Sequence, residues 1–380
     1  MSRETKVSYL DVLIEESDFN NNKIIMSLHL VSLVVLLTIF LITLSFIGNV
    51  NNNKFQIYEN AVNLSNKYRN DSDVKIILLW TQIRSGSRFT GELLSIGSST
   101  FYIDEPIAEL RQSATRNMTT INISTFLDDI LHCNYMKYRE YYQIRELFLH
   151  THTKEIFTMK RTNILSGDLL MGFDEEFCKI SKYRLCRIVI PSLRYSETLL
   201  EDEKYKLIFL IRDPRAISNS KENLSEMRKT ELVYQQNPCQ KLYFDLIWYL
   251  KLRKRHPDRL MHIYYEDLAL NTKERVKEMY SFIGLPYTNL VEGLTMQKTN
   301  FEPQSWDPYS TLRVSTERTY KWRFEMSFEA VKDIQIKCRR TFKILGYRIF
   351  RNEKEYKNLN NSHIKSFKNY QELLFSSNLD

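Results

Sequence analysis

A charge-free apolar run near the N-terminus constrains the chain more than any other feature. From Ile24 to Ile47 there is no Asp, Glu, Lys or Arg, and His29 is the only strongly polar ring. A helix of this length crosses the roughly 30 Å hydrocarbon layer of a bilayer. A cleaved signal peptide is the alternative, but its apolar core spans about 7 to 15 residues and begins nearer the first residue. We therefore expect an uncleaved transmembrane anchor over residues 24–48.

The flanking residues suggest how the chain is divided. Arg3, Lys6 and Lys23 precede the apolar run, whereas Lys54 and Lys67 follow it closely. This bias favours a cytoplasmic tail over residues 1–23 and a lumenal body. The polar, Asn-rich residues 49–73 are typical of a stem. We expect a globular domain over residues 74–350, followed by a polar C-terminal tail over residues 351–380.

Glycosylation triplets and cysteines agree with a lumenal body. Asn-x-Ser/Thr triplets begin at Asn63, Asn70, Asn117, Asn122, Asn223 and Asn360. The five cysteines lack the C-x-x-C spacing of a zinc or redox site, and in an oxidising lumen they are expected to pair. Cys178 with Cys186 would close a short loop and Cys239 with Cys338 a long one, leaving Cys133 over. Buried reduced thiols are the alternative.

Within the body, strands and helices alternate. Aliphatic runs of strand length occur in "VKIILLW", "YKLIFLI" and "RLMHIYYEDL", and the first two pass through short turns into segments with helical spacing. This alternation predicts an α/β fold with a central parallel sheet flanked by helices. Ligands of such sheets bind at the carboxyl ends of the strands. Two arginine-bearing turns lie at such ends.

The first turn is suited to an anion. Ser85, Gly86 and Ser87 follow the first strand and let successive N–H groups converge, and the next helix adds its positive N-terminal end. Arg84 and Arg88 offer guanidinium forks that match phosphate or sulfate. The stretch lacks the first Gly and the Lys of a Walker A loop. A solvated strand-to-helix turn is the alternative.

The second turn is suited to another anion. In "RDPRAISNS", Arg212 leaves a strand, Asp213 is placed to cap a helix, and Pro214 fits the first turn of that helix. Ser220 follows Arg212 by about two helical turns. Arg212 and Ser220 together predict a second phosphate site. Two such turns suit a nucleotide with anionic groups at both its 5′ and 3′ ends.

These motifs resemble those of the Golgi carbohydrate sulfotransferases, especially the group that sulfates the 6-hydroxyl of N-acetylglucosamine, galactose or N-acetylgalactosamine. The family's 5′-phosphosulfate loop, R-[ST]-G-S-[ST]-F-x-G-E-L, is similar to "RSGSRFTGEL", and its 3′-phosphate motif, R-D-P-R-A-x-x-x-S, to "RDPRAISNS". "FYIDEPI" matches the family's Tyr-x-x-Glu-Pro motif. The segment "YEDL" and the block at residues 310–347 are also similar to the family. The similarity runs from about Val74 to Tyr347.

The resemblance implies a single-pass type II enzyme of the Golgi membrane with a P-loop-like sulfotransferase fold. It implies 3′-phosphoadenosine 5′-phosphosulfate (PAPS) as sulfate donor, a glycan or proteoglycan as acceptor, and no metal. Arg212 and Ser220 would bind the 3′-phosphate. The first turn would hold the 5′-phosphosulfate through Arg84, Ser85, Gly86, Ser87 and Arg88, and Phe89 would pack the helix below. Arg88 and Pro191 depart from the family, which has a small hydroxyl residue and a Lys at these positions.

The chemistry of sulfuryl transfer gives roles to further residues. Charge builds on the bridging oxygen as it leaves, and we expect Arg84 to stabilise it. The attacking hydroxyl must lose a proton, for which Glu105, after the strand "STFYI", is the first candidate base. His150 and His152 are alternative bases, and Glu105 would then bind acceptor or be structural. Arg313 belongs to a basic, hydroxyl-rich stretch suited to closing over the nucleotide, as do Arg318, Lys321 and Arg323.

Charge and motifs limit the other functions. The net charge of +8 suits an anionic donor and anionic glycans. Nucleic acid would suit that charge too, but the sequence contains no recognised nucleic-acid-binding module, and the anchor puts the body in another compartment. A P-loop small-molecule kinase lacks its lysine here, and a non-catalytic glycan-binding protein on the same scaffold stays open. Anchors and stems often bring copies together, which is compatible with a homodimer.

Overall fold

The computed structural model describes residues 73–96, 100–107, 122–138, 175–176, 178–224, 237–299, 314 and 316–377. The expected membrane anchor at residues 24–48 lies outside this part, as do the expected tail at 1–23 and nearly all of the stem at 49–73. Of the helices in the described ranges, none has the length and apolarity needed to cross a bilayer. The anchor therefore stays a prediction from sequence.

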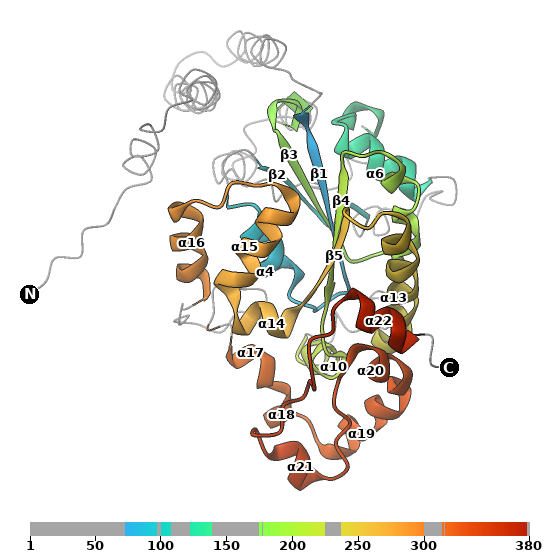
Figure 1. Ribbon diagram of the computed structural model, residues 1–380, viewed down its shortest axis with the longest axis vertical. Helices are drawn as coiled ribbons and strands as arrows, with labels where there is room; N and C mark the ends of the chain where they lie inside the picture. Colours follow the sequence, from blue (N-terminus) through green and yellow to red (C-terminus); the bar gives the residue numbers. More distant parts are fainter. Residues whose placement is uncertain are drawn as a thin grey trace, which may run out of the picture.

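Five parallel strands form the centre of the domain (Figure 1). The strand order is β2-β3-β1-β4-β5, and all four neighbouring pairs are parallel. The chain therefore starts in the middle, builds one side of the sheet with β2 and β3, and then the other with β4 and β5. The strands are β1 (Lys75–Trp80), β2 (Thr100–Asp104), β3 (Tyr183–Ile188), β4 (Tyr205–Ile211) and β5 (Leu260–Tyr264). The expected parallel α/β architecture is confirmed.

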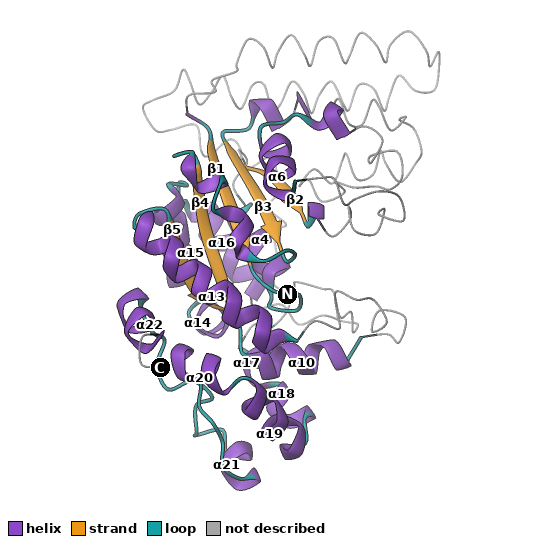
Figure 2. Cartoon of the chain, turned by 90° about the vertical axis from the view of Figure 1, so that its right-hand side faces the viewer, coloured by secondary structure: helices purple, strands orange, loops and turns teal. Residues whose placement is uncertain are grey.

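Helices cover both faces of the sheet (Figures 1 and 2). One face carries α4 (Ser87–Leu94), α14 (Tyr265–Leu270), α15 (Thr272–Ile283) and α16 (Asn289–Thr299). The opposite face carries α6 (Ile123–Leu131) and α13 (Pro238–Arg255). Short 3₁₀ turns are η4 (Tyr135–Tyr138), η5 (Leu193–Ser196) and η6 (Leu199–Glu201).

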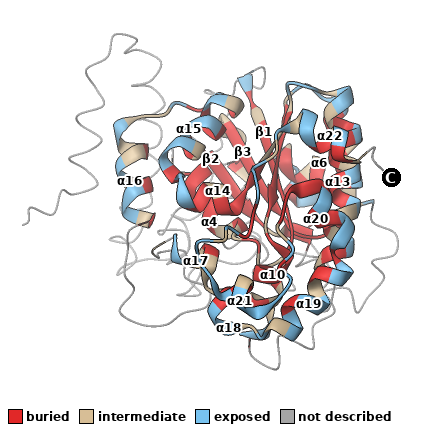
Figure 3. Cartoon of the chain, turned by 60° about the horizontal axis from the view of Figure 1, so that its bottom comes forward, coloured by how far each residue is buried: buried red, intermediate tan, exposed pale blue. Residues whose placement is uncertain are grey.

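Burial on both faces explains the uninterrupted aliphatic runs. In β1, Ile77 and Leu79 join the core under α4 and α15, whereas Ile76, Leu78 and Trp80 join the core under α6 and α13. Strand side chains alternate between faces, so a strand covered on both sides needs apolar residues at every position. Figure 3 shows the sheet as the most buried layer.

Two further helices, α20 (Arg339–Leu345) and α22 (Tyr370–Ser377), pack against α13 and contribute to the core on its face of the sheet. The remaining helices gather beyond the carboxyl ends of the strands (Figure 1). They are α10 (Pro214–Glu222), α17 (Glu317–Tyr320), α18 (Trp322–Glu325), α19 (Phe328–Lys337) and α21 (Glu353–Lys357). The segment expected as a polar tail packs on the domain as far as residue 377. The Arg323 guanidinium donates to backbone carbonyls of this segment, including that of Asn361 at 2.8 Å. Tyr347 and Ile364 form an isolated antiparallel β-bridge.

Two disulfides lie in the core on the α6 and α13 face of the sheet. Cys239 bonds to Cys338, which confirms the expected long loop, and Cys133 bonds to Cys178. The expected bond between Cys178 and Cys186 is wrong. Cys186 lies in the middle of β3 as a fully buried free thiol, and Cys178 instead meets Cys133 at the end of α6. Sequence spacing does not show which partner a helix brings close.

Candidate active site

The turn between β1 and α4 is shaped by its backbone. Arg84 and Gly86 both have positive φ, 71° and 88°, a conformation that favours glycine. The Ser85 hydroxyl donates to the Gln82 carbonyl at 2.7 Å, which closes the turn. Gly86 is the N-cap of α4 and has no side chain to occupy the first N–H groups of that helix. An anion accepted there would face those N–H groups and the positive end of the helix.

An aromatic ring holds this turn from below. A Cβ at Gly86 would lie 2.3 Å from Cε2 of Tyr265, so only glycine fits above the ring. The same ring lies 4.2 Å from the Arg212 guanidinium carbon, a cation–π contact. Tyr265 therefore touches both arginine-bearing turns.

Hydrogen bonds connect the two turns directly. Arg84 Nε donates to Ser220 Oγ at 2.9 Å, although these residues are 136 positions apart in the sequence. Arg212 Nη1 donates to the carbonyl of Arg84 at 2.8 Å, and its Nη2 to the carbonyl of Arg318 at 3.3 Å. Arg84, Arg212 and Ser220 are all partly exposed. The two predicted anion sites thus adjoin one open edge of the sheet.

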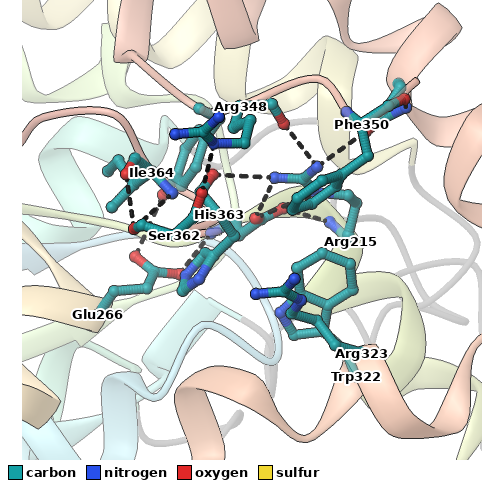
Figure 4. A network of polar contacts seen from close by, with 12 residues as sticks. Arg215, Glu266, Trp322, Arg323, Arg348, Phe350, Ser362, His363 and Ile364 are labelled. Atoms are coloured by element: carbon teal, nitrogen blue, oxygen red, sulfur yellow. Dashed lines mark hydrogen bonds and ion pairs between the residues drawn. The ribbon is translucent and has the colours of Figure 1, made fainter. Parts of the chain in front are cut away.

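A buried polar network fixes the start of α10. Asp213 caps the helix by accepting from the N–H of Arg215 at 2.9 Å, and Pro214 occupies its first turn, both as expected. The Asp213 N–H donates to Glu266 at 2.9 Å, and Arg215 donates to the carbonyls of Arg348 and His363 (Figure 4). Three distant segments of the chain therefore hold the second turn in place.

Burial changes the acidity of two groups in this network. Burial, together with the neighbouring Asp213 carboxylate, raises the pKa of Glu266 to about 7. Burial lowers the pKa of His363 to about 4, and nearby arginines act in the same direction. Neither ring nitrogen of His363 has a hydrogen-bond partner within the described ranges. The network therefore favours a neutral His363 near neutral pH and a protonated Glu266 below about pH 7.

Glu105 lies at the carboxyl end of β2, beside the first turn. Its φ is 52°, and its side chain is 28% exposed, so the carboxylate can meet a substrate. It forms an ion pair with Nη2 of Arg187. The preceding Asp104 is buried and also pairs with Arg187. Arg88 Nη2 lies 3.4 Å from Asp104, so this arginine is directed toward the end of β2.

Comparison with known proteins places this chain. A family model described as "Sulfotransferase domain" matches residues 75–346. The chain belongs to the sulfotransferase domain family. Carbohydrate sulfotransferase 3 of Mus musculus is 26% identical over 322 residues, covering 72% of this chain and 68% of the relative. Carbohydrate sulfotransferase 1 of Danio rerio is 25% identical over 349 residues, covering 78% and 83%. The resemblance to carbohydrate sulfotransferases is confirmed, and the protein is a sulfotransferase.

A solved structure adds a more distant similarity. The sulfotransferase domain of the Synechococcus PCC 7002 olefin synthase aligns with a TM-score of 0.41 and 15% identity, covering 74% of this chain and 98% of that one.

The structure places most predicted site residues of this sulfotransferase around one edge. Residues from both turns and from the end of β2 meet there: Arg84, Ser85, Gly86, Ser87, Arg88, Glu105, Arg212 and Ser220. Phe89 packs in the core under α4, as expected. Arg313, His150 and His152 lie outside the described residues. The roles of all these residues stay predictions.

One expectation for the basic C-terminal stretch is corrected. Arg323 is 1% exposed and holds backbone carbonyls of the C-terminal segment, so it does not belong to a loop over the nucleotide. Lys321 pairs with Glu325 at 2.9 Å. The backbone carbonyl of Arg318 accepts from Arg212. Within the described ranges no group of three or more His, Cys, Asp or Glu is arranged to hold a metal.

Sequence reasoning missed two residues of the sulfotransferase site. Tyr265 stands in a matched segment, but nothing in "YEDL" shows that its ring lies under both turns. Arg187 is 3% exposed in the fully buried strand β3, which also contains Arg184. A charged residue in a buried strand needs a partner, and that was the available signal.

Proposed function

We propose that the protein transfers the sulfuryl group of PAPS to a hydroxyl of a glycan. The first acceptors to test are the 6-hydroxyls of N-acetylglucosamine, galactose and N-acetylgalactosamine. One observation carries the proposal: the Arg84–Ser220 hydrogen bond of 2.9 Å joins two turns that each suit an anion. A donor with a phosphosulfate at one end and a 3′-phosphate at the other fits two adjoining sites of this kind.

The two turns would hold the donor at its charged ends. The N–H groups of Ser85–Ser87 and the start of α4 would face the 5′-phosphosulfate. Arg212 and Ser220 would bind the 3′-phosphate, with Arg212 steadied by the Tyr265 ring at 4.2 Å. Arg84 lies between the two turns, where it would stabilise the negative charge that develops on the leaving phosphate.

Glu105 would accept the proton of the attacking sugar hydroxyl. It is the partly exposed carboxylate beside the first turn, whereas Asp104 is buried and held by several partners. A general base must lie within hydrogen-bond reach of the proton that it takes. Glu105, at the end of β2 beside the first turn, would meet this condition for an acceptor bound next to the donor.

We further propose a Golgi membrane enzyme with its catalytic domain in the lumen. The apolar run at residues 24–47 supplies the anchor, and the six glycosylation triplets suit a lumenal body. The two disulfides support an oxidising compartment, because such bonds are rare in the cytosol.

The test is direct. The purified full chain in detergent is incubated with ³⁵S-labelled PAPS and an array of glycosaminoglycan and N-glycan acceptors, with and without ATP and magnesium. We expect labelled glycan in the absence of ATP and magnesium. A parallel incubation with γ-³²P-labelled ATP and magnesium detects phosphoryl transfer, and ³²P-labelled acceptor without ³⁵S transfer would indicate a kinase. Binding of 3′-phosphoadenosine 5′-phosphate (PAP) without transfer to any acceptor would indicate a non-catalytic glycan-binding protein.

A further inference from the structure

We propose that Arg187 is a positioning residue that fixes the carboxylate of Glu105 relative to Ser87 of the donor turn. The inference rests on the proposed function, because it concerns how that site is held together. Arg187 belongs to none of the motifs that carry the resemblance, and its position became evident only in the structure.

Strand register brings Arg187 to the site. It is paired in register with Asp104 of β2 on one side and with Leu79 of β1 on the other. Side chains alternate along a strand, so Arg187 shares the face of Tyr183 and Leu185, which pack under α4. Because Arg187 stands near the carboxyl end of β3, its guanidinium reaches the first residue of α4.

The guanidinium joins the two halves of the site. Nη1 donates to Ser87 Oγ at 2.7 Å, whereas Nη2 contacts Glu105 Oε1 as an ion pair without hydrogen-bond geometry. Nε pairs with Asp104 Oδ1. The planar fork of arginine presents these donors in fixed directions, which a lysine ammonium does not. One rigid group therefore sets the distance between the donor turn and the candidate base.

The backbone of Arg187 holds Glu105 as well. The N–H of Glu105 donates to the carbonyl of Arg187 at 3.0 Å. Glu105 has a φ of 52°, a strained value for a residue with a side chain. Such a conformation persists where the surroundings determine it, and here Arg187 supplies both a backbone and a side-chain contact. Strained residues of this kind cluster at functional sites.

Asp104 and Glu105 have different tasks in this cluster. Asp104 is buried and satisfied, since it accepts from Tyr102 at 3.1 Å and also faces Arg187 and Arg88. It balances the charge of Arg187, which a buried strand would otherwise not tolerate. Glu105 is partly exposed, and Arg187 is its one ion-pair partner within the described ranges. Asp104 thus has the structural task, and Glu105 is the carboxylate that would act on the acceptor.

Two variants of Arg187 test the proposal in the full chain, with wild-type transfer as the reference. We expect Arg187→Met to lower kcat about 10- to 100-fold, because Glu105 loses its orientation, and to leave PAP binding within about threefold. Arg187→Lys should restore only part of kcat, because a lysine ammonium lacks the planar fork.

A double-mutant cycle with Glu105→Gln separates positioning from general damage. If Arg187 acts through Glu105, adding Arg187→Met to the Glu105→Gln variant should lower kcat by less than about threefold. Should Arg187→Met alone fail to fold because Asp104 is left buried without a partner, Arg187→Met with Asp104→Asn carries the same measurements. An unchanged kcat in Arg187→Met, or full additivity with Glu105→Gln, would overturn the proposal.

Arg184 supplies the matched control. It lies on the same strand and is 4% exposed, and its guanidinium donates to the backbone carbonyls of Cys178 and Leu131 on the opposite face. Arg184→Lys should lower thermal stability while leaving kcat within about threefold of wild type. A wild-type enzyme that transfers no sulfate overturns the proposed function and this inference together, whereas an active wild type with unaffected Arg187 variants overturns this inference alone.

Discussion

At the residue scale, the site depends on a few side chains that serve both turns. Arg84 shows this best, because its side chain reaches Ser220 of the second turn while its own carbonyl accepts from Arg212. A change at either arginine should therefore disturb both turns. Tyr265 is the shared support beneath them.

Removing either arginine should abolish transfer without unfolding the protein. We expect Arg84→Ala and Arg212→Ala to lower kcat/KM at least about 100-fold, since each removes a cation that faces developing or fixed negative charge. Both side chains are partly exposed, so the core is not disturbed. Activity and circular dichroism measure the two effects. The exposed Arg255, which pairs with Glu201 at 2.9 Å far from the site, is the control. Wild-type rates in Arg84→Ala would contradict the assignment.

A glycine substitution tests the shape of the first turn. Gly86→Ala should lower the free energy of unfolding by roughly 1–3 kcal/mol, because its Cβ would overlap the Tyr265 ring and its φ is 88°. Gly293 is the matched control. It lies within α16, and a Cβ there meets nothing within 4 Å, so Gly293→Ala should stabilise by about 0.5–1 kcal/mol. Urea titration measures both. Equal effects in the two variants would exclude the steric account.

At the scale of elements, the two turns were predictable because their chemistry is local. An aliphatic strand, a turn with serine, glycine and arginine, and a following helix lie next to each other in the sequence, and Asp213 and Pro214 fix the start of α10 as expected. Long-range pairings were not predictable in this way. Arg187 meets Glu105 only because β2 and β3 are neighbours in the sheet, an order that composition does not show.

The disulfide pairing is another long-range contact that the sequence does not show, and it can be tested. Mass spectrometry of the unreduced protein should find Cys133 with Cys178 and Cys239 with Cys338. Cys186 should stay unreactive to iodoacetamide until the protein unfolds, because it is fully buried and burial raises the pKa of its thiol. Replacing Cys239 and Cys338 by Ala should cost about 2–5 kcal/mol of stability. A peptide that joins Cys178 to Cys186 would contradict the structure.

At the scale of the whole molecule, buried charges connect parts of the chain that the sequence keeps far apart. Arg215 of α10 donates to the carbonyls of Arg348 and His363, and Glu266 of α14 holds the N–H of Asp213 (Figure 4). The C-terminal segment is thereby part of the support beneath the second turn. A substitution that disturbs this network should consequently change both the free energy of unfolding and the affinity for the donor.

The pH dependence of stability reports on Glu266. Its pKa is raised from 4.5 in the unfolded chain to about 7 in the folded protein. The contribution of this carboxyl to the free energy of unfolding is therefore fully present below pH 4.5 and is lost as the pH rises to 7. Glu266→Gln does not titrate and can still accept from Asp213. The variant should therefore gain roughly 3 kcal/mol relative to wild type between these pH values. Urea titrations at several pH values measure the difference.

The comparison has to be a difference between proteins, because a second buried group acts in the opposite direction. The pKa of His363 is lowered from 6.5 to about 4, so its contribution grows as the pH rises through this range and offsets that of Glu266 in the wild-type curve. Subtracting the wild-type curve from that of Glu266→Gln removes the histidine term, since His363 is present in both. Glu329→Gln, on the exposed face of α19, should track wild type throughout. A flat difference for Glu266→Gln would mean that this carboxyl ionises in the folded protein as readily as in the unfolded chain.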